Sequence, residues 1–232
     1  ENSIISFPEF LLLVLDVCTG GEQPASHYQP DKLIEKFNAL KTHFTAGEFY
    51  EKMLYYRLLL DYYTIRRDIK DGQGNYSLIL KGPQDDSDKL KQYQSMLYVS
   101  TEAFYNWLKP YLRKLEQDEL QSCAEMLAFL KKEDNERHSI LPARKDLSYK
   151  ASGNIRYWFW RLDYYLWEQR STFFNEEEQK IVEHYVFRRN RSSEHLHPQD
   201  ESHNEEWEEE AVHSFGNLAM ISQSFNSQQS ND

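Results

Sequence analysis

Two histidines one residue apart stand in the stretch "RSSEHLHPQD", which runs from Arg191 to Asp200 of the 232-residue chain. Glu194 directly precedes the first of them, His195, and His197 follows two residues later. On a strand, side chains alternate between the two faces, so both imidazoles would share one face. An imidazole can act as a general base or bind a metal, and a carboxylate can hold a divalent cation. These residue types therefore allow a metal clip, a hydrolytic site or a polar loop that carries histidines.

An H-x-H pair on one strand is a common half of a zinc site. His203 and His213 could complete such a site in principle. No second cluster with ligand spacing accompanies them, and the two cysteines form no CxxC pair. A zinc-binding hydrolase that uses His195 and His197 is thus one hypothesis, and it depends on the number of histidines alone.

A longer pattern surrounds the first histidine. "EHLHPQ", a tryptophan at position 207, "HSFGNLAMIS" and "NSQQSN" follow one another in this order. In residue identity, order and spacing the pattern resembles an HNH module, which is a ββα-metal nuclease. The resembled module is the one at the C-terminus of GmrSD-type restriction enzymes, which are modification-dependent (type IV). The resemblance is strong over about the last forty residues. The aromatic segments "LLLDYYTIRRD" and "IRYWFWRLDYYLWE" are similar, less specifically, to the helical part of the same enzymes.

The resemblance implies a role for each motif residue. His195 matches the general base, and Glu194 matches the acidic metal ligand before it. Asn226 matches the last metal ligand, on the helix of the module, and Asn217 matches the middle asparagine that ties the loop together and orients the base. Phosphodiester hydrolysis needs a base for water and a cation that stabilises the developing charge. Two oxygen ligands with open positions suit one Mg²⁺ or Mn²⁺ better than zinc.

Other residues near the motif have two interpretations each. Arg188, Arg189 and Arg191 are candidates for contacts to the phosphate backbone, or they form a solvated strand edge. His197 could contact phosphate or assist the base, and we favour a surface position for it. The remaining histidines here are expected to be structural or solvated, with His213 close to the substrate. The acidic block "DESHNEEWEEE" is expected to be a solvated helix face rather than a second metal site.

Composition and charge narrow the class of protein. The chain is 40% hydrophobic and 15% aromatic, which is enough to fill a core. Its net charge of −11 argues against a general nucleic-acid coat protein, because such proteins bind phosphate through clustered Lys and Arg. The longest apolar run, "FLLLVLDVC", is too short to cross a membrane. The cysteines are expected to be reduced thiols of a cytoplasmic protein, bacterial or archaeal if the resemblance holds.

Apolar residues recur at helical spacing from Phe7 to about Arg170. The spacing predicts helices over 30–44, 46–70, 88–115, 117–133 and 154–171, with a break that contains an extended "YSLIL". The segment 46–70 is apolar nearly all round, which predicts a central helix. Within 154–171 an aromatic and aliphatic stripe is expected to pack in the core: Ile155, Trp158, Phe159, Leu162, Tyr165 and Leu166.

The pattern changes after Asn175. Residues 180–192 and 216–222 are predicted to be strands, with a short helix around 204–215 and a helix start in 223–232. The predicted fold class is therefore mainly α: a helical bundle domain over 1–174, then an HNH-like ββα-metal nuclease module over 175–232. The sequence ends with "QQSND", so we expect the helix that bears the metal ligand to be short.

Full-length enzymes of the resembled family carry an N-terminal NTP-dependent domain with a "DGQQR"-like motif. The "DGQGN" at 71–75 lacks the second glutamine and the arginine, and we interpret it as a turn. No P-loop motif is present either. The chain is therefore expected to be the C-terminal portion of a longer enzyme, with that domain as its partner.

Two hypotheses remain beside that of a zinc hydrolase or structural zinc site at His195 and His197. The first is a metal-dependent DNA endonuclease from a phage-defence restriction enzyme that cuts modified foreign DNA. The second is a helical interaction or regulatory domain with a vestigial HNH motif, which the net charge of −11 favours somewhat. Convergence of Glu194, His195 and Asn226 would favour the nuclease, whereas converging imidazoles would favour the zinc hydrolase.

Overall fold

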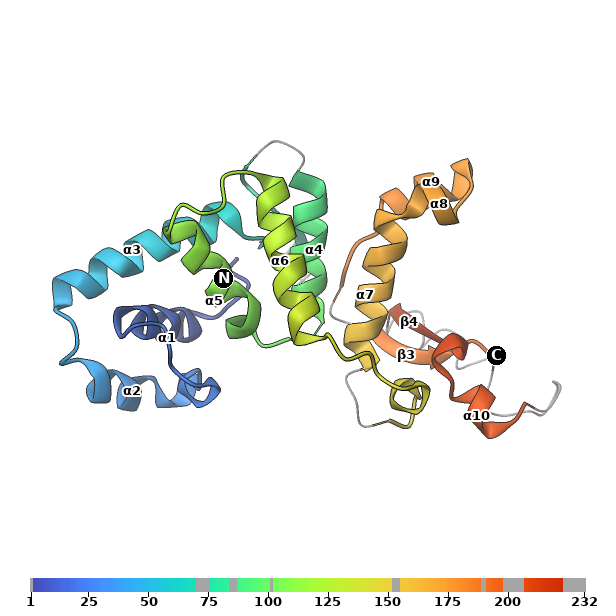
Figure 1. Cartoon of the computed structure of the whole chain (residues 1–232), viewed down its shortest axis with the longest axis horizontal. Helices are drawn as coiled ribbons and strands as arrows, with labels where there is room; N and C mark the ends of the chain where they lie inside the picture. The colour runs from blue at the N-terminus through green and yellow to red at the C-terminus, as the bar shows by residue number, and fades with distance from the viewer. Residues whose placement is uncertain are drawn as a thin grey trace. The chain divides into compact units, whose positions relative to one another are not determined.

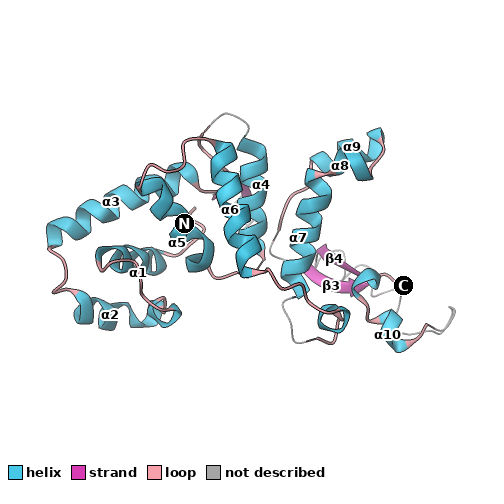
Figure 2. Ribbon diagram, viewed as in Figure 1, coloured by secondary structure: helices cyan, strands magenta, loops and turns pink. Residues whose placement is uncertain are grey.

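The computed structural model describes residues 2–69, 76–83, 87–100, 102–151, 155–188, 191–197 and 207–222. These residues are mainly helical with two small sheets, which confirms the predicted fold class (Figures 1 and 2). The α-helices are α1 (Phe7–Cys18), α2 (Leu33–Leu40), α3 (Ala46–Tyr63), α4 (Ser87–Val99), α5 (Phe104–Glu116), α6 (Cys123–Arg137), α7 (Ile155–Glu168), α8 (Arg170–Phe173), α9 (Glu176–Glu183) and α10 (Glu209–Val212). The strands are β1 (Arg66–Ile69), β2 (Tyr76–Ile79), β3 (Arg191–His195) and β4 (Leu218–Ser222), and the 3₁₀ turns are η1 (Ala25–His27), η2 (Pro30–Lys32), η3 (Arg144–Leu147) and η4 (Phe215–Asn217).

The chain forms two compact units. The first comprises Glu1–Tyr98 and Glu102–Arg137, and the second comprises Val99–Thr101 and His138–Asp232. The expected boundary between 174 and 175 falls inside the second unit, so α7 shares a unit with the β3–β4 hairpin. That boundary stays a prediction about the extent of the nuclease module.

Helix α1 is the centre of the first unit. It begins with a capping box in which Ser6 and Glu9 bond to each other's backbone N–H groups. The run from Leu12 to Leu15 is completely buried, and α1 packs against α2 and α3. Within the described residues, no helix combines the length and the apolar composition that crossing a membrane requires.

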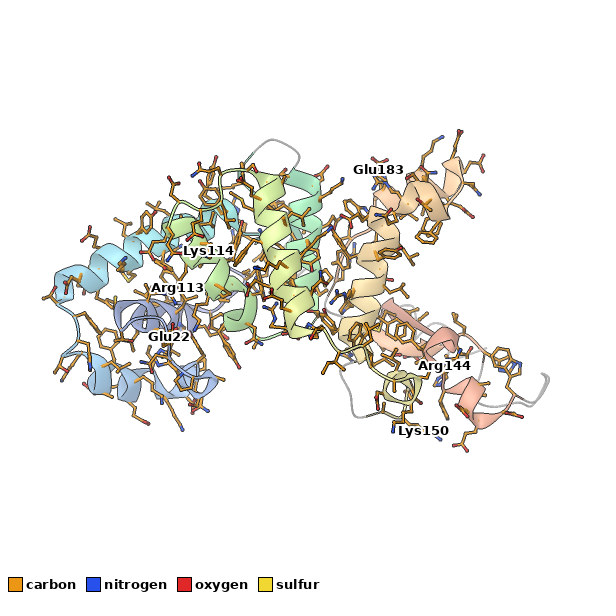
Figure 3. The ribbon with its side chains drawn as sticks, viewed as in Figure 1. Glu22, Arg113, Lys114, Arg144, Lys150 and Glu183 are labelled. Atoms are coloured by element: carbon orange, nitrogen blue, oxygen red, sulfur yellow. The ribbon has the colours of Figure 1, made fainter. Side chains whose placement is uncertain are left out.

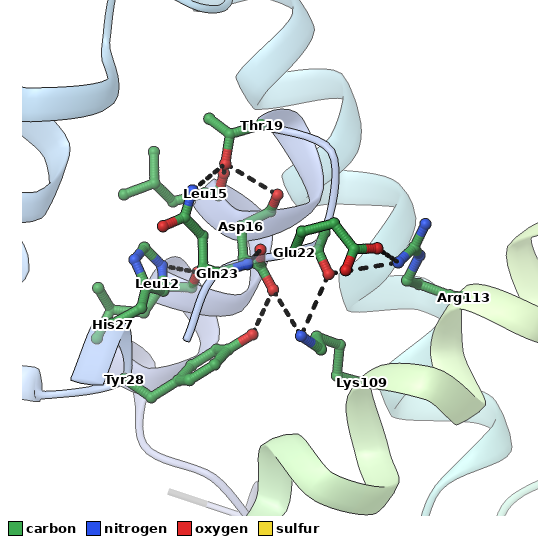
Figure 4. Close-up of polar contacts among 11 residues, drawn as sticks. Leu12, Leu15, Asp16, Thr19, Glu22, Gln23, His27, Tyr28, Lys109 and Arg113 are labelled. Carbon is green, nitrogen blue, oxygen red and sulfur yellow. Dashed lines mark hydrogen bonds and ion pairs between the residues drawn. The ribbon is translucent and has the colours of Figure 1, made fainter. Parts of the chain in front are cut away.

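A buried carboxylate lies on α1 among these apolar residues (Figure 4). Asp16 has no exposed surface, and its Oδ2 accepts hydrogen bonds from the Tyr28 hydroxyl and from Lys109 Nζ, the latter at 3.1 Å. Its Oδ1 accepts from the Gln23 backbone N–H at 2.9 Å. Burial and the hydrogen bond to Asp16 raise the pKa of Tyr28. Because a buried charge must be paired, this cluster joins α1 to α5.

Helix α3 is not the central helix that its apolar composition predicts. It buries Phe49, Tyr56, Leu59 and Leu60. A second stripe at four-residue spacing is exposed: Tyr50, Leu54, Leu58 and Tyr62. The helix also ends at Tyr63 rather than at residue 70, because Arg66–Ile69 pairs as β1 with Tyr76–Ile79. This pairing confirms the extended "YSLIL", while "DGQGN" lies outside the described residues.

Helix α7 is the aromatic helix of the second unit, but its buried face differs from the predicted one. It buries Tyr157, Phe159, Trp160, Tyr164 and Trp167. Of the predicted stripe only Phe159 is buried, and Tyr165 is 51% exposed. The Phe159 ring stacks on Phe215 with centroids 4.1 Å apart, which fixes η4 against α7.

The predicted strand over 180–192 is wrong in its first half. Residues up to Glu183 are helical, because Asn175 caps α9 with a capping box that includes Glu178. A strand begins only at Arg191, where β3 pairs antiparallel with β4. This hairpin confirms the predicted "GNLAMIS" strand from Leu218 on, and α10 is the predicted short helix. The helix expected in 223–232 lies outside the described residues.

Candidate active site

The β3–β4 hairpin fixes the position of the glutamate–histidine pair. His195 is the last residue of β3 and lies opposite Leu218, while Glu194 lies opposite Ala219. Residues that lie opposite each other in an antiparallel pair face the same side of the sheet. Leu218 is buried, so the imidazole of His195 lies beside an apolar wall and is itself only partly exposed.

Asn217 closes the loop between the two strands. Its Oδ1 accepts from the His197 backbone N–H at 2.8 Å, and its Nδ2 donates to the carbonyls of His197 at 3.3 Å and Val212 at 2.7 Å. Its own backbone carbonyl accepts from the Leu196 N–H at 2.8 Å. The side chain is buried. Asn217 therefore holds the chain just after His195 against the chain just before β4.

The imidazole of His195 contacts a second imidazole. His195 Nε2 and His213 Nδ1 are 3.0 Å apart, which is a hydrogen-bond distance. The Tyr149 ring lies 4.4 Å from the His195 ring between centroids and stacks over His213 at 6.0 Å. The Tyr149 backbone N–H donates to the His213 carbonyl at 2.9 Å. The segment after η3 thus forms one side of the site.

These surroundings lower the pKa of His195. Burial is the main cause, because it disfavours the charged ring, and His213 lowers the pKa further. The carboxylate of Glu194 acts in the opposite direction. The result favours a neutral imidazole at pH 7, which is the form that can take a proton from water.

Glu194 is the one predicted metal ligand that lies within the described residues. Its carboxylate raises the pKa of His195 slightly, against the effect of burial. A carboxylate oxygen with the amide oxygen of Asn226 would form a hard donor set that suits Mg²⁺ or Mn²⁺, but Asn226 lies outside the described residues. Within the part of the chain that the structure describes, no group of three His, Cys, Asp or Glu side chains converges as a metal site.

His197 lies next to Trp207. Its ring stacks on the indole with centroids 4.2 Å apart at 18°, and it is half-buried. The His197 backbone N–H donates to the side-chain Oδ1 of Asn217, and His197 lies in a bend after the end of β3. The shared face that the sequence suggested for His195 and His197 therefore does not form, because β3 ends at His195.

The predicted phosphate-binding arginines are only partly described. Arg188 is exposed in the segment before β3. Arg191 begins β3, opposite Ser222, and neither its side chain nor Arg189 lies within the described part. Their role stays a prediction.

Another cationic segment lies beside the site. Arg144 and Lys145 of η3 line a pocket of about 620 Å³, together with Ser214 and Gly216 from the loop that carries His213. Glu208 and Glu210 also line it. Figure 3 labels Arg144 and Lys150 in this part of the second unit. Lys150 forms an ion pair with Glu209, whose pKa it lowers.

Sequence reasoning did not find Arg144, Lys145 or Tyr149. It expected His213 to be structural or solvated and close to the substrate. These residues carry no motif of their own. The first three are more than forty residues before His195 in the chain, and only the fold brings Tyr149 to the two imidazoles. The phrase "VHSFGNL" does place His213 next to the "GNL" of the motif, and this was the one available signal.

One comparison with known proteins finds a family for the C-terminal part of the chain. Residues 132–232 match the family model described as GmrSD restriction endonucleases, C-terminal domain. This confirms the resemblance that the motif indicates, and the matched range includes η3, α7 and both strands of the hairpin. No curated protein and no solved structure matches the chain. The C-terminal part of the chain is therefore similar to the nuclease part of type IV restriction enzymes.

Proposed function

We propose that the chain is a metal-dependent DNA endonuclease that hydrolyses phosphodiester bonds. His195 is the general base, and Glu194 and Asn226 are the ligands of one Mg²⁺ or Mn²⁺. The observation that supports this proposal most is the position of His195, at the end of a hairpin that Asn217 closes, inside the region that matches a restriction endonuclease domain. The module is proposed to act within a phage-defence restriction enzyme on modified foreign DNA, together with an NTP-dependent domain.

The chain's own residues divide the work of hydrolysis. A neutral His195 accepts the proton of a water molecule that attacks phosphorus, while Tyr149 and Leu218 shield one side of the imidazole. Asn217 fixes the backbone next to the base, which keeps the imidazole oriented. When bound at Glu194 and Asn226, the cation would stabilise the negative charge that develops on the phosphate.

DNA is the proposed substrate, and two sets of cations are proposed to bind its backbone. Arg188, Arg189 and Arg191 flank the start of β3, and Arg144 and Lys145 line the pocket beside His213. Phosphate contacts position a duplex without reading its sequence. His197, stacked on Trp207, is proposed to lie near this surface.

Metal dependence is the direct test of the proposal. Plasmid DNA, with and without modified bases, is incubated with the full chain in Mg²⁺, in Mn²⁺ or in EDTA. We expect nicking in either metal and none in EDTA, and we expect Glu194→Gln, which keeps the shape but removes the charge, to require more metal. Nicking at equal rates in EDTA, or a Glu194→Gln variant with an unchanged metal requirement, would contradict the assigned ligand.

A matched control is available on another acidic residue of the second unit. Glu177 on α9 is exposed and contributes only a backbone N–H to the Asn175 cap. Glu177→Gln removes the same charge and should leave the metal requirement unchanged. Equal effects of the two variants would indicate a general loss of negative charge rather than loss of a ligand.

A further inference from the structure

An exposed apolar ridge on α3 lies outside the core and outside the candidate active site. The buried face of α3 packs against α1 and α5 in the first unit (Figure 1). The ridge, which consists of Tyr50, Leu54, Leu58 and Tyr62, is on another face of the helix, and its residues are 47% to 65% exposed. We propose that it binds the same ridge of a second copy of the chain, so that the protein forms a two-fold symmetric dimer through α3. The inference goes beyond the proposed nuclease function and does not depend on it.

The spacing of the ridge is that of a contact between two helices. Side chains four residues apart lie nearly above one another on a helix, so the four residues form one continuous row. Such a row fits into the groove beside the same kind of row on a facing helix, with the two axes crossing at about 50°, and this is the commonest class of helix packing. From Tyr50 to Tyr62 the row extends over about 18 Å of helix, since each residue adds about 1.5 Å.

The order of residues in the ridge fits a second copy. It reads Tyr, Leu, Leu, Tyr in both directions along the helix. When a two-fold axis passes midway between Leu54 and Leu58, the two helices run antiparallel, and each ridge meets the other in reverse order. Leu54 then lies opposite Leu58 of the partner subunit, and Tyr50 lies opposite Tyr62 of the partner subunit. Every position of the ridge therefore meets a residue of its own type, which is the self-complementarity that a two-fold interface requires.

The charged residues beside the ridge are compatible with this pairing. On one side Arg57 is the charge nearest the axis, and its Nε donates to Asp61 Oδ2 at 2.8 Å, so each copy brings its own counter-charge. On the other side the nearest charge is Glu51. The two Glu51 carboxylates would lie about 15 Å apart along the helices, and charges at that separation are largely screened at physiological salt, where the Debye length is about 8 Å. The charges that flank the ridge on α3 therefore do not oppose association.

The exposed area of the ridge fits a reversible dimer rather than an obligate one. A buried aromatic side chain removes about 150 to 250 Å² from water, and a leucine somewhat less. About half of each ridge residue is exposed, and Tyr55 beside the ridge is 42% exposed. Together they offer on the order of 500 Å² per copy, so a dimer would bury on the order of 1,000 Å², which is the lower bound for a specific interface. We therefore expect a dissociation constant in the micromolar range.

The oligomeric state tests the proposal without any cleavage activity. Sedimentation equilibrium of the full chain over a range of micromolar concentrations should show a monomer–dimer equilibrium. Leu54→Lys places an unpaired charge in each half of the interface and should raise the dissociation constant about 100-fold or more. Ile140→Lys, at an exposed aliphatic residue of the second unit, is the matched control and should leave the constant unchanged. A native chain that stays monomeric over this range, or a Leu54→Lys variant that dimerises like the native chain, would overturn the proposal.

A pair of opposite charges tests the antiparallel pairing itself. Leu58→Glu alone should also be monomeric, because its carboxylate would face Leu54 of the partner subunit. In an equimolar mixture of the Leu54→Lys and Leu58→Glu chains, the two new charges face each other, and the other half of the interface keeps its two leucines. We expect this mixture to dimerise at concentrations where each variant alone is monomeric. Both positions are exposed, so far-UV circular dichroism should show native helix content in each variant. A mixture of folded variants that stays monomeric would overturn the pairing of Leu54 with Leu58.

Discussion

Burial lowers the pKa of two histidines in this chain, His195 and His27, and the two differ in their contacts. His27 is completely enclosed in the first unit. Its Nε2 lies 2.8 Å from the Leu12 carbonyl, which only accepts, so the ring proton must be on Nε2. Its Nδ1 is buried and finds no hydrogen-bond partner among the described residues. Protonation of that nitrogen would therefore bury an unsatisfied N–H.

This arrangement predicts a pH dependence of stability. Because the folded state lowers the pKa of His27, its contribution to stability is complete above the unfolded value of about 6.5 and is lost as the pH falls below it. Asp16 acts against the shift, while Lys36 and Lys109 reinforce it. In the His27→Gln variant the amide can still donate to the Leu12 carbonyl. Below about pH 6.5 we expect its free energy of unfolding to fall less steeply with decreasing pH than that of the native protein. Parallel curves for the two proteins in urea titrations would contradict this account.

The second prediction at this scale concerns Asn217. Asn217→Leu removes three hydrogen bonds and leaves the backbone groups of His197 and Val212 without them. Each unsatisfied buried group costs about 1 to 3 kcal/mol. We therefore expect the His197 amide to exchange its hydrogen faster. A local loss of about 1.4 kcal/mol in stability corresponds to a tenfold faster exchange. Asn217→Asp keeps the acceptor for that amide and is the matched control, and equal exchange in all three proteins would show that the loop does not depend on Asn217.

The roles of the individual motif residues stay predictions. The positions of His195, Glu194 and Asn217 follow from the pattern "EHLHPQ … FGNL", and the fold places the three at the two ends of one hairpin loop. Tyr149 could not be predicted in the same way. Its contact with His195 depends on how a loop 46 positions earlier packs, and no local pattern in the sequence encodes that packing.

At the scale of elements, the pair of Asp16 and Lys109 joins α1 to α5. Asp16 is fully buried and Lys109 is mostly buried, so removing the lysine would leave an uncompensated charge. We expect Lys109→Met to destabilise the first unit by about 3 kcal/mol. Lys114→Met on the same helix breaks a largely exposed pair with Glu119 and should cost less than about 1 kcal/mol. Thermal unfolding of both variants measures this difference. Equal shifts in Tm would show that the buried pair stabilises the unit no more than the exposed pair does.

The η3 segment carries a prediction about DNA binding. The double variant Arg144→Ala, Lys145→Ala should bind DNA more weakly, with a slope of log affinity against log salt that is smaller by about 2, because each phosphate contact contributes about one unit. Lys180→Ala on α9 removes an exposed cation elsewhere in the second unit and should change neither value. Fluorescence anisotropy with a labelled duplex at several salt concentrations gives both slopes. An unchanged slope in the double variant would leave the arginines around β3 as the phosphate contacts.

Helices were predicted in the right places but often with the wrong buried face. In α7 aromatic residues occupy most positions, so the apolar pattern allows several faces, and neighbouring elements choose the one with Trp160 and Trp167. In α3 apolar residues occupy nearly all positions, so the pattern predicted a helix buried on every side, whereas one stripe of its residues is exposed. The strand over 180–192 was misjudged because Ile181 and Val182 favour strands intrinsically, while the Asn175 cap starts a helix before them.

At the scale of the whole molecule, two compact units with different content make up the chain. The first contains α1 to α6 and a small hairpin, and the second contains α7 to α10 and the candidate active site. Fold class and the existence of a C-terminal hairpin followed from sequence. The division after Arg137 was not predicted, because the change in pattern after Asn175 placed the expected boundary there. The family match begins at residue 132.

Net charge also acts at this scale. With −11 overall, the chain should repel DNA except where cations cluster, so its binding should depend strongly on salt. Non-specific electrostatic attraction to DNA therefore cannot account for cleavage by this chain, which must depend on particular catalytic residues. The decisive experiment therefore concerns His195.

That experiment compares plasmid nicking by the native chain, His195→Ala and His184→Ala, in Mg²⁺ or Mn²⁺, on modified and unmodified DNA. His184 is exposed at the end of α9 and serves as the matched control. Loss of a general base costs about 10²- to 10⁴-fold in rate, so we expect His195→Ala to be inactive by that measure and His184→Ala to match the native chain. Metal-dependent nicking that persists in His195→Ala at the native rate would contradict the assignment of the base and, with it, the proposed active site.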